Sequence, residues 1–184
     1  MNILVDKLPN EYEGLKINTD FRTSILFELL MQERNLTPQD KISLSLRLYY
    51  NEIPLDIKTA LNGILWLYSC GKEDNNIKKG NKGNNSKQIY SFEYDANYIY
   101  SAFLEQYGID LNETNMHWWK FRALFNGLNE NVLFSKIMSY RSVNLDSIKD
   151  EEQKKYYKKM KKVYALPDNR SKEEKEEDFA NALV

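Results

Sequence analysis

Two side chains in the sequence could take part in nucleophilic or acid–base chemistry, His117 and Cys70, and each is the only one of its type. His117 follows Glu113 by about one helical turn, and a carboxylate at that spacing could orient an imidazole that acts as a general base. Such a pair is common, and a packed or surface histidine is the more frequent explanation. Cys70 is expected at the C-terminal end of a helix, whereas activated thiols usually lie at a helix N-terminus. Neither residue predicts an active site.

Larger motifs for catalysis and for cofactor or metal binding are also absent from the sequence. It contains no glycine-rich phosphate loop, no CxxC pair, no HExxH motif and no GxSxG motif. With 1 histidine and 1 cysteine, the chain can form neither a multi-histidine metal site nor an internal disulfide. We therefore expect a protein that is not an enzyme and that uses no cofactor and no metal.

The size and composition of the chain are those of a globular protein. Its 184 residues suit one domain or two small lobes, 42% of them are hydrophobic, and the formal net charge is −1. No apolar run approaches the roughly 18 residues that a membrane span needs, and the N-terminus does not have the order of a secretory signal. We expect a protein that stays in the cytoplasm in which it is made, with no membrane partner.

Helical spacing of apolar residues and helix-start signals predict a mainly α fold, a bundle of about six or seven helices with a small N-terminal β element. Residues 42–48 alternate as a strand would, but Thr37-Pro38-Gln39-Asp40 is a helix-start signal and favours a helix. The expected helices cover residues 20–34, 37 onward, 54–70, 95–107, 116–127, 131–140 and 148–164. The residues expected to form the apolar faces of the first two helices are Phe21, Ile25, Leu26, Leu29 and Leu30, then Ile42, Leu46 and Tyr49.

Composition divides the chain into four segments. They are a helical half with the short β arm at 1–70, a linker at 71–88, a second helical half at 89–166 and a charged tail at 167–184. The linker is rich in Asn, Lys and Gly and is expected to be flexible, because it cannot bury enough surface to offset its ordering entropy. The tail carries 6 acidic and 3 basic residues and is expected to fray or to fold on a partner. We expect the halves to pack together, because each alone has a thin core.

A run of 6 lysines between Lys154 and Lys162 is the main charge feature of the last predicted helix. Its positive field could bind nucleic acid, but the helix contains no Arg, and no helix-turn-helix or RNP motif accompanies it. A solvated face, or contact with an acidic protein, is the more frequent explanation. The candidates for an electrostatic contact are Lys154, Lys155, Lys158 and Lys162.

Aromatic residues are the candidates for binding another protein. Trp118 and Trp119 beside Lys120 could form a stacking platform for bases or sugars, but adjacent helical residues point about 100° apart, which favours core packing. Tyrosine buries a large area at small entropic cost and suits a binding surface. We predict a partner groove lined by aromatics drawn from Tyr98, Tyr100, Trp118, Trp119, Tyr156 and Tyr157.

The element His117-Trp118-Trp119-Lys120-Phe121, followed by Tyr140-Arg141 and by DEEQKKYY at 150–157, resembles a family of small proteins from tailed bacteriophages and prophages of Gram-positive bacteria. The stretches Ile17–Arg22 and Tyr107–Leu111 match the same pattern. The likeness covers roughly residues 1–70 and 88–166. HWWKF is the most specific of these matches, because a tryptophan pair rarely arises by composition.

The resemblance implies a role in phage tail morphogenesis, because members of that family are encoded near the tape-measure gene. It implies a chaperone-like protein of the host bacterial cytoplasm that coats the tape-measure protein until tail-tube subunits polymerise around it, without enzymatic activity. Two alternatives stay open: a nucleic-acid-associated phage protein that uses the Lys154–Lys162 helix, and a structural subunit of the virion. The oligomeric state is open, and a homo-oligomer is one of the possibilities.

Overall fold

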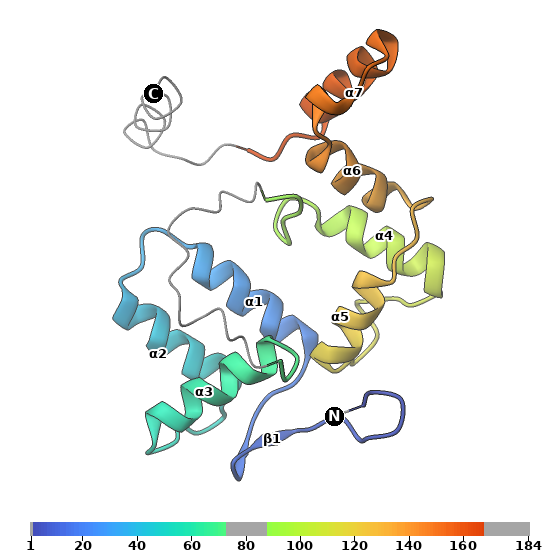
Figure 1. Cartoon of the computed structure of the whole chain (residues 1–184). Coiled ribbons are helices and arrows are strands. Elements are labelled where there is room, and N and C mark those ends of the chain that lie inside the picture. The colour runs from blue at the N-terminus through green and yellow to red at the C-terminus, as the bar shows by residue number, and fades with distance from the viewer. Residues whose placement is uncertain (1, 73–87, 168–184) are drawn as a thin grey trace.

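The computed structural model describes residues 2–72 and 88–167, which form seven α-helices, one 3₁₀ helix and one two-stranded hairpin (Figure 1). This confirms the predicted mainly α fold with a small N-terminal β element. Residues 73–87 of the predicted linker and 168–184 of the predicted tail lie outside the described residues. The elements are β1 (Glu11–Tyr12), β2 (Leu15–Lys16), α1 (Phe21–Gln32), α2 (Pro38–Tyr49), α3 (Ile57–Tyr68), α4 (Ala96–Tyr107), α5 (Trp118–Asn126), α6 (Leu133–Ser142), η1 (Leu145–Ser147) and α7 (Glu151–Val163).

The start of α2 explains why its alternating sequence forms a helix. Thr37 and Asp40 form a capping box, in which the Asp40 N–H donates to Thr37 Oγ1 at 3.1 Å and the Thr37 N–H donates to the Asp40 carboxylate at 3.2 Å. Pro38 occupies the first helical position, where its missing N–H costs no hydrogen bond. The helix predicted from Thr37 onward is therefore confirmed.

One hydrophobic core draws on helices from both sides of the 73–87 gap. At its centre, the ring of Phe121 on α5 stacks on Phe21 of α1 and on Phe103 of α4, with ring centroids 4.9 and 5.0 Å apart. Stacked pairs of this kind add to the free energy gained by burying the rings. These aromatic rings therefore pack the two halves of the described chain against each other.

Backbone hydrogen bonds also join the two halves directly. The Trp118 N–H donates to the Thr19 carbonyl at 2.7 Å, and the Phe21 N–H donates to the Met116 carbonyl at 2.9 Å. These bonds form a short antiparallel bridge between the segments that immediately precede α1 and α5. The two helices therefore begin side by side.

Arg141 on α6 holds three segments of the second half together. Its guanidinium makes a two-point ion pair with Asp95, at 2.5 and 2.8 Å, and both side chains are buried. The same guanidinium donates to the carbonyl of Ile89 at 3.1 Å and to that of Tyr164 at 2.6 Å. Arg141 thus ties the chain before α4 and the chain after α7 to α6.

α7 lies at the edge of the molecule and packs chiefly on α6 and η1 (Figure 1). It contains no buried residue. Its contact with α6 is made by aromatic rings: Tyr140 stacks on Tyr164 with centroids 5.9 Å apart and meets Tyr156 and Tyr157 at 6.1 and 6.0 Å. We refer to these rings together with Tyr98, which meets Tyr164 at 6.3 Å, as the tyrosine cluster.

Replacing Asp95 would leave the Arg141 guanidinium buried without its carboxylate. We expect Asp95→Ala to lower the free energy of unfolding by about 3–5 kcal/mol, the usual cost of removing one partner of a buried ion pair. Lys136→Ala, at an exposed position of α6, is the control and should change it by less than about 0.5 kcal/mol. Urea denaturation followed by circular dichroism measures both. Equal stability of the two variants would contradict the role assigned to Arg141.

Candidate functional site: a protein-binding groove

His117 caps the start of α5 and attaches the N-terminal arm to it. The Trp119 N–H donates to Nδ1 of His117 at 3.0 Å, so Nδ1 carries no proton and Nε2 donates to the Pro9 carbonyl at 2.9 Å. Burial lowers the pKa of His117 below its ordinary value and so favours the neutral ring. Because both ring nitrogens are used in the fold, neither is available for acid–base chemistry with Glu113.

Trp118 and Trp119 support the C-terminal end of α3. The Trp118 Nε1–H donates to the Tyr68 carbonyl at 3.0 Å, and the Trp119 Nε1–H donates to the Leu67 carbonyl at 2.7 Å. Carbonyls in the last turn of a helix have no N–H partner four residues on within that helix. The Trp118 indole supplies a donor to the Tyr68 carbonyl, and the Trp119 indole adds a donor to the Leu67 carbonyl, which also accepts from the Cys70 N–H at 3.1 Å. Trp118 is 0% and Trp119 6% exposed. The prediction that these tryptophans line a partner groove is wrong, because both rings are buried and their N–H groups are engaged.

Cys70 lies just after α3 in a left-handed backbone conformation, with φ 58°. Burial raises the pKa of its thiol, which keeps it in the protonated, weakly nucleophilic form. The structure therefore gives Cys70 no feature of an activated nucleophile.

The four tyrosine candidates are divided between two places. Tyr98, Tyr156 and Tyr157 belong to the tyrosine cluster between α4, α6 and α7. Tyr100, two residues after Tyr98, points to another side of α4, where a hydrogen bond to Asp110 raises its pKa. The structure therefore brings three of the six predicted aromatics together and leaves Tyr100 apart from them.

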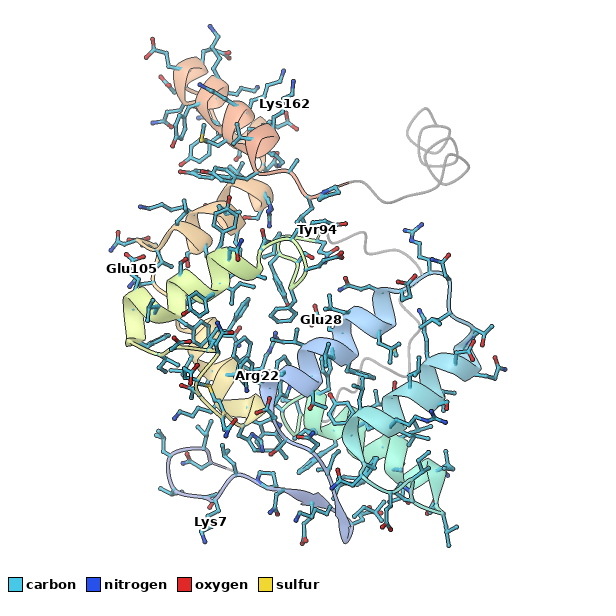
Figure 2. All side chains as sticks on the ribbon, turned by 180° about the vertical axis from the view of Figure 1, so that it is seen from behind. Lys7, Arg22, Glu28, Tyr94, Glu105 and Lys162 are labelled. Carbon is cyan, nitrogen blue, oxygen red and sulfur yellow. The ribbon has the colours of Figure 1, made fainter. Side chains whose placement is uncertain are left out.

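The predicted lysines all lie on the outlying helix α7. Lys155, Lys158 and Lys162 are exposed, and Lys154 is half-buried. Lys162 projects outward at the edge of the molecule (Figure 2). These side chains are displayed on one element and are not gathered around a cavity.

An apolar groove lies between α1 and α2, and two of its lining residues, Leu29 and Leu48, also pack against the core. Its volume is about 460 Å³. Among its lining residues, Leu26 is 51% and Leu44 39% exposed, so a partner could bury more of their surface. We call this hollow the leucine groove; its lining residues are Leu26, Leu29, Leu30, Glu33, Leu36, Leu44, Arg47 and Leu48.

Sequence reasoning missed the leucine groove because it assigned one apolar face to each helix. In α2 the alternating apolar residues lie about 200° apart around the helix. Leu46 therefore enters the core, whereas Leu44 and Leu48, one turn apart, reach the groove. Leu26 was likewise expected in the buried stripe of α1, and this was wrong. The period-two pattern is the signal that could have revealed a helix with two apolar faces.

The model of the bacteriophage Gp15 protein family matches residues 4–166. The chain belongs to this family. The expectation of a phage protein, based on the HWWKF element, is thereby confirmed. The match takes in both helical halves, and with them the leucine groove and α7. Neither a curated protein nor a solved structure matches the chain.

Two features are absent from the described residues, a membrane-spanning helix and a metal-binding cluster. None of their helices has the length and apolar character needed to cross a membrane. No three His, Cys, Asp or Glu side chains among the same residues gather where they could bind a metal ion.

The capping role of Trp118 can be tested by removing its N–H. In Trp118→Phe, we expect the lost hydrogen bond to the Tyr68 carbonyl to lower the free energy of unfolding by about 1–3 kcal/mol. The cavity left by the smaller ring lowers it further. Phe125→Leu, another buried change on α5, controls for packing loss without loss of a donor. The exchange rates of the last amides of α3, measured by hydrogen exchange, should rise more in Trp118→Phe. Equal rates in the two variants would show that the indole does not stabilise the end of α3.

The lowered pKa of His117 predicts a pH dependence of stability. Because the folded pKa lies below the unfolded value of about 6.5, the unfolded chain binds the extra proton first as pH falls. Stability from this group is complete above about pH 6.5 and declines as the pH falls toward the folded pKa. His117→Asn keeps a capping oxygen but does not titrate. Its free energy of unfolding should therefore fall less between pH 7.5 and 5.5 than that of the native chain; parallel curves would refute the assignment.

Proposed function

We propose that this member of the bacteriophage Gp15 family acts in tail morphogenesis as a chaperone-like protein, and that the leucine groove holds an apolar segment of the tape-measure helix. The observation that carries the proposal is the groove itself. Two consecutive helices present leucines outward, although each already buries other residues in the core. Outward-facing apolar surface rimmed by polar residues is typical of protein interaction sites.

The geometry of the leucine groove fits recognition of a helix. Leu29 and Leu30 follow Leu26 by three and four residues on α1, and Leu44 and Leu48 lie one turn apart on α2. An amphipathic helix placed in such a groove buries side chains at the same spacing. Glu33 and Arg47 line the groove with opposite charges, which could orient a partner with complementary ends.

We infer further that the protein works without catalysis. His117, which could act as a general base, caps α5 instead, and burial raises the pKa of the Cys70 thiol, which keeps it protonated and weakly nucleophilic. Support for the tail assignment comes from the resemblance of the HWWKF element and from membership of a phage family. The tape-measure protein suits the groove as a partner because it is a long helix with apolar stretches that need cover before assembly.

The leucine groove can be tested by placing a charge in it. We expect Leu26→Asp to weaken capture of the co-expressed tape-measure protein at least tenfold, because burying one leucine contributes about 1.5–3 kcal/mol. Leu104→Asp is the matched control, since Leu104 is 46% exposed on α4, away from the groove. Co-purification followed by titration of the isolated partner segment measures the affinity.

Three outcomes would count against the proposed function. Equal affinity of Leu26→Asp and Leu104→Asp would exclude the groove as the binding site. Failure of the native chain to retain the tape-measure protein would exclude that partner. Stoichiometric copies of the chain in purified virions, found by mass spectrometry, would favour a structural subunit over a transient chaperone.

A further inference from the structure

α7 presents a second surface, separate from the leucine groove, which the proposed function leaves without a role. Tyr156 and Val163 are seven residues apart, so they lie two turns apart on nearly the same line along the helix. Tyr156 is 49% and Val163 61% exposed. We call these two residues the apolar seam of α7.

A stripe of lysines runs beside the apolar seam. At about 100° per residue, Lys155, Lys159 and Lys162 fall within roughly 60° of one another, and Lys159 lies next to the seam. In the described parts of the chain, no hydrogen bond or ion pair engages the ammonium groups of these three residues. Lys161 differs, because its Nζ donates to the Val143 carbonyl at 2.5 Å. The stripe therefore carries charge that the described fold does not neutralise.

We propose that the apolar seam and the lysine stripe of α7 bind an acidic amphipathic helix of a partner protein. Apolar side chains of that helix, spaced three or four residues apart, would cover Tyr156 and Val163. Its Asp and Glu side chains would face Lys155, Lys159 and Lys162. Paired charges beside an apolar seam are the arrangement by which helices select partners and orientation.

The same surface suits nucleic acid less well. Phosphates would pair with the lysines but leave the 61% exposed Val163 without a contact. α7 also lacks Arg, the residue most used for base readout. An acidic polypeptide helix can use both the charge and the apolar seam.

The length of α7 sets the size of the contact. Its 13 residues span about 20 Å, enough for three to four turns of a partner helix. α7 packs chiefly on α6 and η1 (Figure 2), and within the described parts of the chain Lys155, Lys159 and Val163 are exposed. A partner would cover the exposed part of Tyr156, a member of the tyrosine cluster whose ring also meets Tyr140.

The test uses the full chain and a synthetic peptide of about 14 residues, matched to the length of α7, with a leucine stripe flanked by glutamates. We expect the native chain to bind this peptide and to bind a shuffled peptide of the same composition at least tenfold more weakly. Lys155→Glu/Lys159→Glu and, separately, Val163→Asp should each weaken binding at least tenfold. Lys120→Glu/Lys136→Glu makes the same charge change at exposed positions of α5 and α6 and should leave the affinity unchanged. Fluorescence anisotropy measures the affinity.

Several outcomes would overturn the proposal. One is equal weakening by the two double variants, which would indicate general charge attraction. A second is that the chain binds a random duplex DNA more tightly than the peptide. If this DNA binding is lost in Lys155→Glu/Lys159→Glu but unchanged in Val163→Asp, the surface belongs to nucleic acid. A third is peptide binding that appears only after residues 168–184 are deleted, which would assign it to the acidic tail of the chain itself. None of these results depends on the tape-measure protein.

Discussion

The junction of α5 with the ends of α1 and α3 is the contact on which the rest of the described structure depends. There the backbone of Trp118 pairs with Thr19, and its indole donates to Tyr68. α3 lies before residues 73–87 in the sequence and α4 lies after them, and contacts of this kind join the two parts of the described chain. Next to this junction, the ring of Phe121 stacks on Phe21 and Phe103, and burial of these three rings adds apolar contact between α5, α1 and α4.

Polar side chains of the HWWKF element satisfy backbone groups at the ends of helices. A buried N–H or carbonyl without a partner costs free energy, so folds place polar side chains where helices begin and end. His117 accepts from the first turn of α5, and Trp119 donates to the last turn of α3. This explains why the HWWKF element needs these residue types: each of its first three side chains makes a hydrogen bond that an aliphatic side chain could not make.

The two candidate binding surfaces lie at different ends of the molecule (Figure 1). The leucine groove belongs to the first two helices, and the apolar seam belongs to the last described helix. Arg141 connects α7 to the body through its bonds to Asp95 and Tyr164, so the position of the second surface depends on this buried guanidinium together with the tyrosine cluster. A protein with this layout could hold two segments at once, one bound mainly by apolar contact and one also by charge.

The sequence by itself determined where the helices lie, because apolar spacing, the Thr37–Asp40 cap and the turn at Gly108 act within a few neighbouring residues. It also indicated the phage family through HWWKF. Only the tertiary structure decided which aromatic and apolar residues stay exposed. Trp118 and Leu26 both lie on amphipathic helices, yet one is fully buried and the other half exposed. Exposure depends on which other elements cover a helix face, and those elements come from distant parts of the chain.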